Sequence, residues 1–209
     1  MREVGMRGAG MQMMGDARAR RQRGGDGCTL GRMSFASIPL TGDKPDQYAQ
    51  LAAQARALLH GERDRIANAA NLSALVYHAL PELNWVGFYF FDGTELVVGP
   101  FQGLPACVRI PLDKGVCGAA ARTRSTQRVA DVHDFPGHIA CDAASRSEVV
   151  VPLLRGDALI GVFDIDSPVP DRFDVHDQTG LEALAAVFVD SLVQADTPLA
   201  AAQSLAASA

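Results

Sequence analysis

The stretch WVGFYFFDGTELVVGPF, residues 85–101, decides the fold class. Its first seven residues are aromatic or β-branched apart from one glycine, and residues 95–101 are again mostly apolar. Between them stands Asp92-Gly93, a dipeptide that favours the tight turn of a β-hairpin. Two antiparallel strands joined by this turn are therefore predicted in the middle of the chain.

Further strands are expected around this hairpin. Residues 106–112 predict a third strand, and residues 127–132 predict a brief fourth one. Residues 148–154 and 158–165 form a second hairpin across the tight turn Arg155-Gly156-Asp157. A series of hairpins of this kind indicates an antiparallel sheet.

Helices are predicted before, between and after the strands. Apolar side chains recur at helical spacing in residues 45–60, and a second helix over residues 62–78 has Ile66 on its inward face. Residues 116–124 predict a short alanine-rich helix, and residues 175–193 carry one apolar stripe. We therefore expect an α+β fold, with an antiparallel sheet flanked by helices on one face.

Length and composition predict one domain with a tail at each end. A chain of 209 residues, 48% of them hydrophobic, can bury one sizeable core. We expect residues 1–40 to be a disordered or misassigned N-terminal extension, residues 41–195 to form the domain, and residues 196–209 to fray. Residues 1–32 carry a net charge of +4 and the remainder −9, so the acidic body argues against nucleic acid as a partner.

The chain has neither a secretory signal pattern nor an apolar run of about 20 residues that could cross a membrane. A reducing, cytoplasmic location is therefore expected. In that setting the four cysteines favour catalysis, redox chemistry or metal binding over structural disulfides. We assign no role to Cys28.

The other three cysteines, Cys107, Cys117 and Cys141, fall within 35 residues. Cys107 stands in an alternating segment, where a small buried side chain is the simpler interpretation, and for Cys117 the two interpretations are balanced. Cys141 lies in residues 131–145, an irregular segment that is long for a connection, and a protonated His138 nearby would lower its thiol pKa. Loop placement makes Cys141 the candidate nucleophile.

A metal site is the alternative for these residues. His138 and Cys141 are three apart, and Cys117 and His133 would complete a set of four ligands. Structural zinc sites usually combine two close-spaced pairs, whereas this sequence offers one pair. We therefore expect no metal.

Acidic and aromatic side chains indicate a binding pocket. Asp164 and Asp166 alternate on one face of a strand, and Glu148 on the neighbouring strand reaches the same face. Carboxylates this close need a cation between them, such as the ammonium of an amino acid, unless they form a solvated strand end. Trp85 and Tyr89 also share one strand face, either as core anchors or as a pocket wall.

Several segments together resemble the free methionine-(R)-sulfoxide reductases. They are LNWVGFY at 83–89, GPFQG at 99–103, ACVRIP at 106–111 and GVCG at 115–118. Residues 131–133, 137–145 and 161–167 and Glu148 agree, so the resemblance covers about residues 45–195. It implies a GAF fold, often a homodimer, whose pocket encloses a whole free amino acid.

The resemblance also implies roles for single residues. Cys141 matches the attacking cysteine and Cys107 the resolving one, with Cys117 as a third cysteine. The positions matching substrate contacts are Trp85, Tyr89, Glu148, Asp164 and Asp166. Trp85 would cover the substrate and leave its indole N–H for the sulfoxide oxygen.

The reaction implied is reduction of the free methionine (R)-sulfoxide. Cys141 becomes a sulfenic acid, Cys107 converts it to a disulfide, and thioredoxin reduces the disulfide, with no bound flavin, nicotinamide or metal. The competing interpretation is a GAF sensor module that binds a small ligand without turning it over.

Overall fold

Six antiparallel strands build the central sheet of the computed structural model, which describes residues 38–135, 137 and 143–193. Their order across the sheet is β3-β2-β1-β6-β5-β4. The strands are β1 (Trp85–Phe91), β2 (Glu95–Gly103), β3 (Arg109–Pro111), β4 (Gln127–Val129), β5 (Ser147–Arg155) and β6 (Ala158–Ser167). The helices are α1 (Lys44–Leu58), α2 (Arg65–Ala79), α3 (Gly115–Thr123) and α4 (Val175–Ser191), with a 3-10 turn at Val132–Asp134. The predicted α+β class is confirmed.

The predicted hairpin is formed by β1 and β2. The Asp92 carboxylate accepts hydrogen bonds from the backbone N–H groups of Thr94 and Glu95, at 2.9 and 3.0 Å, and Gly93 has a positive φ of 103°. Both features are what a tight turn needs. β1 then pairs with β6 on its other side, so it lies inside the sheet and is buried on both faces.

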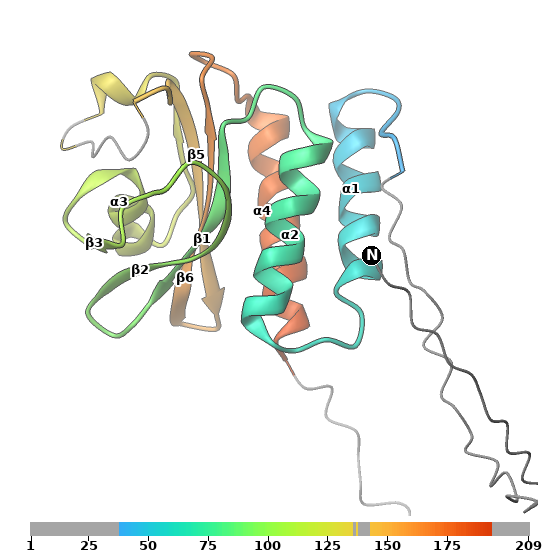
Figure 1. Cartoon of the computed structure of the whole chain (residues 1–209), viewed down its shortest axis with the longest axis horizontal. Coiled ribbons are helices and arrows are strands. Elements are labelled where there is room, and N and C mark those ends of the chain that lie inside the picture. The colour runs from blue at the N-terminus through green and yellow to red at the C-terminus, as the bar shows by residue number, and fades with distance from the viewer. Residues whose placement is uncertain (1–37, 136, 138–142, 194–209) are drawn as a thin grey trace, which may run out of the picture. The chain divides into compact units, whose positions relative to one another are not determined.

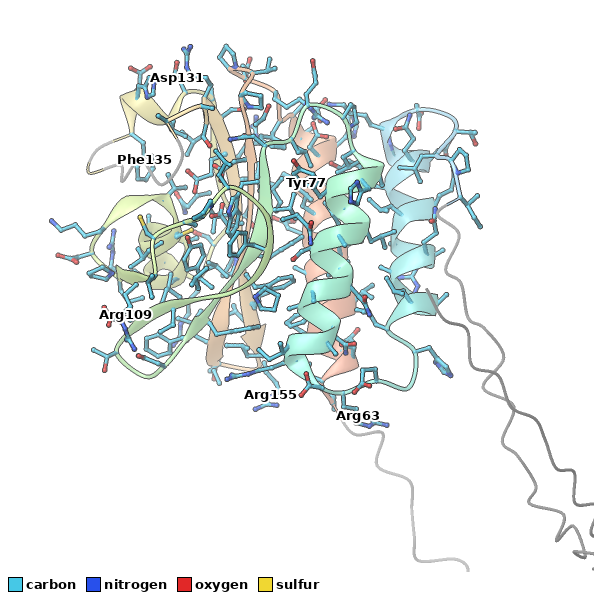
Figure 2. All side chains as sticks on the ribbon, viewed as in Figure 1. Arg63, Tyr77, Arg109, Asp131, Phe135 and Arg155 are labelled. Carbon is cyan, nitrogen blue, oxygen red and sulfur yellow. The ribbon has the colours of Figure 1, made fainter. Side chains whose placement is uncertain are left out.

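Each face of the sheet has its own hydrophobic core. Val86, Phe88 and Phe90 of β1 point to the face covered by α2 and α4, with α1 packed outside them (Figure 1). Trp85 and Tyr89 point to the opposite face, where α3 lies. Figure 2 shows side chains filling the space between the sheet and both layers of helices.

The prediction that helices cover one face only was therefore wrong. α3 packs against the face opposite to the other helices, through Val116, Cys117 and Ala120. The hydrophobic pattern of a nine-residue helix reports which of its sides is apolar, and does not report which face of the sheet it meets. The position of α3 matters because it brings Cys117 to the sheet.

Three local predictions also differ from the structure. The third strand is shorter than residues 106–112, because β3 pairs only with Glu95–Val97 of β2 and residues 104–108 form a loop. The fourth strand stops at Val129, because the Asp131 side chain caps a 3-10 turn instead. Ile66 is 48% exposed, because the preceding Arg65 occupies the place over the Phe90 ring and neighbouring helical residues point about 100° apart.

A buried ionic network joins α1 to the start of α4. Asp177 is 1% exposed and accepts hydrogen bonds from Tyr48 Oη at 2.9 Å, Lys44 Nζ at 2.5 Å and Arg172 Nη1 at 3.1 Å. Asp174 and Asp177 also form a capping box at the N-terminus of α4. This network lies in the helical layer, on the other side of the sheet from α3.

Within the described residues, none of the helices is both long and apolar enough to cross a membrane.

Candidate active site

The predicted acidic residues come together on the α3 face of the sheet. Glu148 of β5 stands opposite Asp166 of β6. Asp164 precedes Asp166 by two residues, so it lies on the same face of the sheet. β1 continues this arrangement, since Trp85 is the register partner of Asp166. Glu148 and Asp164 are only 6% and 5% exposed, so the alternative of a solvated strand end is wrong for these two carboxyl groups.

Cys117 of α3 also belongs to this cluster. It lies in the first turn of α3, and its Sγ is 3.3 Å from Asp164 Oδ2 and 4.0 Å from Glu148 Oε1. α3 packs closely against the backbone at the end of β3 because Gly118 has no side chain. A Cβ there would lie 2.7 Å from the carbonyl oxygen of Pro111. The sequence placed Cys117 with the other cysteines, whereas the structure places its sulfur among the acids.

Burial controls the protonation of the cluster. It raises the pKa of Asp164 to about 6, against hydrogen bonds from Cys117 and Glu148 that lower it. Burial, reinforced by the negative charges of Asp164 and Asp166, raises the pKa of Glu148 well above its usual range. The same combination raises the pKa of the Cys117 thiol, so Cys117 is a protonated donor to Asp164 and not a thiolate.

One oxygen of the cluster has no partner. Asp164 Oδ1 is buried and accepts no hydrogen bond from any described residue. Neither Glu148 nor Asp164 forms an ion pair with a lysine, arginine or histidine in the part of the chain that the structure describes. A buried carboxylate oxygen without a donor is costly, and it is the arrangement expected where a cationic ligand binds.

Trp85 stands beside the acids as a fixed wall. Its ring stacks with the rings of Tyr89 and Phe101, with centroid separations of 5.7 and 5.2 Å. Gly87 makes room for this stack, because a Cβ there would lie 2.3 Å from Phe101 Cβ. The indole Nε1–H donates to the carbonyl oxygen of Leu104 at 3.2 Å, so the expectation that it remains available for a sulfoxide oxygen is wrong.

A small cavity connects these parts. It has a volume of about 10 Å³ and is lined by Trp85, Tyr89, Leu104, Pro105, Ala106, Asp164 and Asp166. At this cavity, therefore, the rings of Trp85 and Tyr89 meet two of the predicted acids and the segment just before Cys107. Sequence reasoning missed residues 104–106, and their position next to Cys107 was the one signal that pointed to them.

The three cysteines differ in what the structure says of them. Cys107 is half-buried in the loop between β2 and β3, outside the strand that sequence alternation predicted for it, and packs at the margin of the α3-side core. Cys117 is buried. Cys141 lies outside the described residues, as does His138, so the proposed nucleophile and the alternative metal set containing both remain predictions.

The segment that carries Cys141 is anchored on both sides. Gly137 accepts a hydrogen bond from the backbone N–H of Gly115, the first residue of α3, at 3.0 Å. On the other side, Arg146 pairs with Asp131 at 2.6 Å, and its carbonyl oxygen accepts from Val132 N–H. These contacts bring the chain on either side of residues 138–142 close to α3 and β5.

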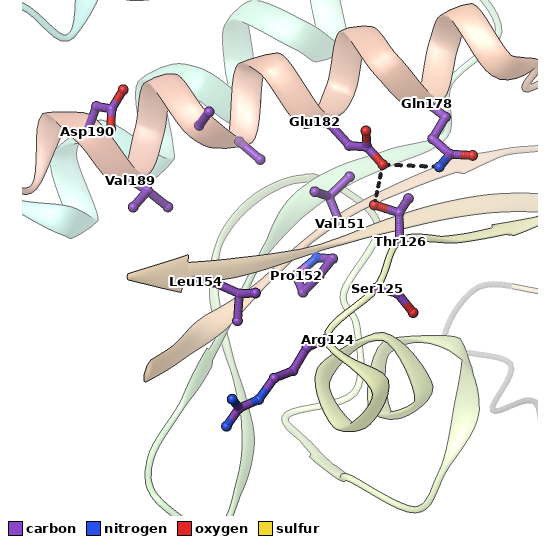
Figure 3. Close-up of a pocket in the computed structure, with 12 residues that line it drawn as sticks. Arg124, Ser125, Thr126, Val151, Pro152, Leu154, Gln178, Glu182, Val189 and Asp190 are labelled. Atoms are coloured by element: carbon purple, nitrogen blue, oxygen red, sulfur yellow. Dashed lines mark hydrogen bonds between the residues drawn. The ribbon is translucent and has the colours of Figure 1, made fainter. Parts of the chain in front are cut away.

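A larger cavity of about 550 Å³ lies elsewhere, between β5, α4 and the turn at Arg124 (Figure 3). One of its two acids, Glu182, already accepts hydrogen bonds from Thr126 Oγ1 at 2.7 Å and Gln178 Nε2 at 3.0 Å (Figure 3). It contains none of the predicted site residues. The reactive groups are in the acid cluster, and size alone does not identify the active site.

Known proteins agree with this assignment. The GAF domain family matches residues 67–192. The chain is 49% identical to the free methionine-R-sulfoxide reductase of Escherichia coli over 154 residues, which cover 74% of this chain and 93% of that protein.

Two solved structures are similar over most of their length. One is a GAF-domain protein from Burkholderia vietnamiensis, with 69% identity, a TM-score of 0.70, and coverage of 72% of this chain and 96% of that one. The other is the free methionine-R-sulfoxide reductase of Neisseria meningitidis in complex with its substrate, with 41% identity, a TM-score of 0.72, and coverage of 75% and 95%. The fold, the cluster of buried acids beside Trp85 and these relatives lead to one conclusion. The chain belongs to the free methionine-R-sulfoxide reductases, a family of GAF-domain enzymes.

Proposed function

We propose that this protein reduces the R-sulfoxide of free methionine to methionine, using Cys141 as nucleophile. The observation that carries the proposal is the buried pair of Glu148 and Asp164 beside the Trp85 wall, with one Asp164 oxygen that no described residue hydrogen-bonds. The relatives from Escherichia coli and Neisseria meningitidis are named for this activity.

The buried acids favour a substrate with a free ammonium group. Asp164 and Asp166 supply negative charge beside Glu148, and no cation from a described residue is paired to Asp164. A free amino acid provides the missing cation, whereas a methionine residue inside a protein has a neutral amide nitrogen instead. Because a buried unpaired carboxylate costs several kcal/mol, the pocket discriminates between the two.

Trp85 contributes shape and an aromatic face. Its ring is held in place by contacts with Tyr89 and Phe101 and its N–H is already bonded to Leu104, so it would contact the substrate side chain through its ring surface and not through a hydrogen bond. The face of an indole ring carries partial negative charge and suits the positive sulfur of a sulfoxide.

The first chemical step reduces the sulfoxide by two electrons and oxidises Cys141. The Cys141 thiolate attacks the sulfoxide sulfur, and a carboxylic acid protonates the departing oxygen. Glu148 is the donor we favour, because burial and the neighbouring carboxylates raise its pKa and keep it protonated. Water then takes the place of the methionine on Cys141, so the substrate sulfur gains two electrons and Cys141 is left as a sulfenic acid.

The second step restores the thiol. Cys107 attacks the sulfenic acid, which releases water and forms a disulfide, and an external dithiol such as thioredoxin reduces that disulfide. Cys141 lies four residues along the chain from Gly137 and four from Ser145, and four residues span at most about 14 Å. Chain length therefore keeps Cys141 within about 14 Å of both Gly137 and Ser145. All electrons come from thiols, so the reaction requires no bound flavin, nicotinamide or metal.

Cys117 supports the site without acting as nucleophile. Its buried thiol donates to Asp164 Oδ2 and stays protonated, which suits a hydrogen-bond partner of the substrate-binding acid. We further propose a homodimer working in the cytoplasm, where thioredoxin keeps thiols reduced. Size measurement in solution tests the dimer.

The test is turnover of the separate R and S isomers of free methionine sulfoxide, coupled to thioredoxin. Single-turnover release of methionine then distinguishes the roles of the three cysteines. Cys141→Ser should release none, whereas Cys107→Ser should release one equivalent and stall as a sulfenic acid that a dimedone-type reagent traps. Cys117→Ser, the matched control, should retain more thioredoxin-linked activity than either. Release of methionine by Cys141→Ser but not by the other two variants would show that the nucleophile is wrongly assigned.

A ligand-sensing GAF module is the second candidate, because the Burkholderia relative is named for a sensor. Tight binding of a small ligand, with turnover absent for both isomers and every dithiol tried, would favour it over the reductase.

A further inference from the structure

The cluster beneath α3 is also a set of metal ligands. Cys117, Glu148 and Asp164 each offer one donor atom, and these three atoms lie within 4.8 Å of one another. All three residues are buried. Cysteine sulfur and carboxylate oxygen are both ligands that bind zinc in proteins.

The separations fit a tetrahedral ion. Zinc binds sulfur at about 2.3 Å and carboxylate oxygen at about 2.0–2.2 Å, so tetrahedral angles place sulfur and oxygen about 3.6 Å apart. The two sulfur to oxygen distances in the cluster are 3.3 and 4.0 Å, on either side of that value. Shifts of a few tenths of an ångström therefore suffice to close the ligands around an ion.

A second observation points to a cation at this place. Asp164 Oδ1 is buried and without a hydrogen-bond partner among the described residues, although Asp164 is only 5% exposed. No described basic side chain forms an ion pair with Glu148 or Asp164. The cluster thus has donor atoms and negative charge in excess of what its protein neighbours satisfy.

We propose that Cys117, Glu148 and Asp164 form a binding site for Zn²⁺, and that the bound ion excludes the ammonium group of the substrate. The thiol selects zinc over magnesium or calcium, which prefer oxygen ligands. On binding, the Cys117 sulfur gives its proton to solvent, as does any carboxyl group of the cluster that carries one. Zinc is thereby an inhibitor that competes for the substrate's place; this second half rests on the proposed function, and the binding site itself does not.

Calorimetric titration of the reduced full chain with zinc chloride tests the site. The Cys107→Ser/Cys141→Ser variant serves as the background, because it removes the two thiols that we assign to catalysis and leaves Cys117. This variant should bind one equivalent of zinc and no magnesium. Cobalt in place of zinc should give an ultraviolet thiolate-to-metal absorption band.

Adding Cys117→Ser to that background should weaken zinc binding about a hundredfold or more, since loss of groups outside the ligand shell already costs roughly ten- to a hundredfold. Glu148→Gln and Asp164→Asn, which keep the size of the side chain, should each weaken it as well. Circular dichroism checks that every variant is folded. Zinc binding that survives Cys117→Ser unchanged, or that is absent from the Cys107→Ser/Cys141→Ser background, would overturn the proposal.

Competition is measured on the same background, which cannot turn over. Zinc-saturated protein should bind free methionine sulfoxide at least about tenfold more weakly than the metal-free protein, in keeping with removal of a charged contact. Simultaneous binding of both ligands would refute the exclusion. Zinc binding in a protein that never binds the sulfoxide would leave the metal site standing and remove the proposed function, so the two failures are distinct.

Discussion

Replacing Asp164 by asparagine should stabilise the folded protein near neutral pH while it weakens substrate binding. Burial raises the pKa of Asp164 to about 6, from an ordinary value of 3.8. Each pKa unit corresponds to about 1.4 kcal/mol, so the ionised carboxylate destabilises the native state by about 3 kcal/mol. Asparagine keeps the size of the side chain and an oxygen that can accept from Cys117, but carries no charge to bury.

The pH dependence of the free energy of unfolding follows from proton binding by Asp164. Between about pH 4 and pH 6 the folded protein holds the Asp164 proton more tightly than the unfolded protein does. This group therefore leaves stability unchanged below that window, lowers it as the pH rises through the window, and exerts its full cost above it. Asp164→Asn should remove that fall.

Urea unfolding at a series of pH values from about 4 to 8 measures the effect. Asp164→Asn should exceed the wild type in free energy of unfolding at pH 7, and the difference should shrink towards pH 4. The control is Asp157→Asn, at an exposed position in the β5–β6 turn, which should change stability by less than about 0.5 kcal/mol at any pH. An Asp164→Asn protein that is less stable than wild type at pH 7, with the same pH profile, would refute the reasoning.

Three further predictions use other parts of the molecule. N-acetylated methionine sulfoxide should be a poorer substrate by about a hundredfold or more in kcat/KM, because it leaves the buried acids without a cation. Gly87→Ala should cost about 1–3 kcal/mol in urea unfolding and raise KM, because its Cβ would lie 2.3 Å from Phe101 Cβ and displace the Trp85 stack. Asp177→Ala should cost about 3–5 kcal/mol, because it leaves Lys44 and Arg172 without their buried partner. Since Asp177 lies in the helical layer, KM should stay unchanged in the folded fraction; a raised KM would contradict that separation.

The case of Asp164 also explains why the cluster is retained. A fold selected for stability alone would place a neutral side chain there, because burying a carboxylate without a cation is unfavourable. A site that must bind an ammonium group needs the charge in place before the ligand arrives. On the function proposed above, binding of the ammonium group offsets the cost in the free protein.

Local patterns were enough to predict the first hairpin and the face that the two aspartates of β6 share. The turn at Asp92-Gly93 predicted the β1–β2 hairpin, because its preference for tight turns is set by its own backbone and side chain. The alternation of residues 163–166 predicted that Asp164 and Asp166 share a face, because side chains in a strand alternate with a period of two. Loop placement made Cys141 the candidate nucleophile, and resemblance to a family added the predicted roles of Cys107 and Cys117.

Contacts between distant segments were decided by the tertiary structure alone. The side of the sheet taken by α3 brings Cys117 to Asp164, which is 47 positions further along the chain. The indole hydrogen bond of Trp85 reaches Leu104, which is 19 positions further along. Sequence periodicity describes which side of an element is apolar and carries no information on which partner it meets. The raised pKa of Asp164 has the same origin, because burial by α3 and the neighbouring strands, and not the identity of the residue, keeps water from its charge.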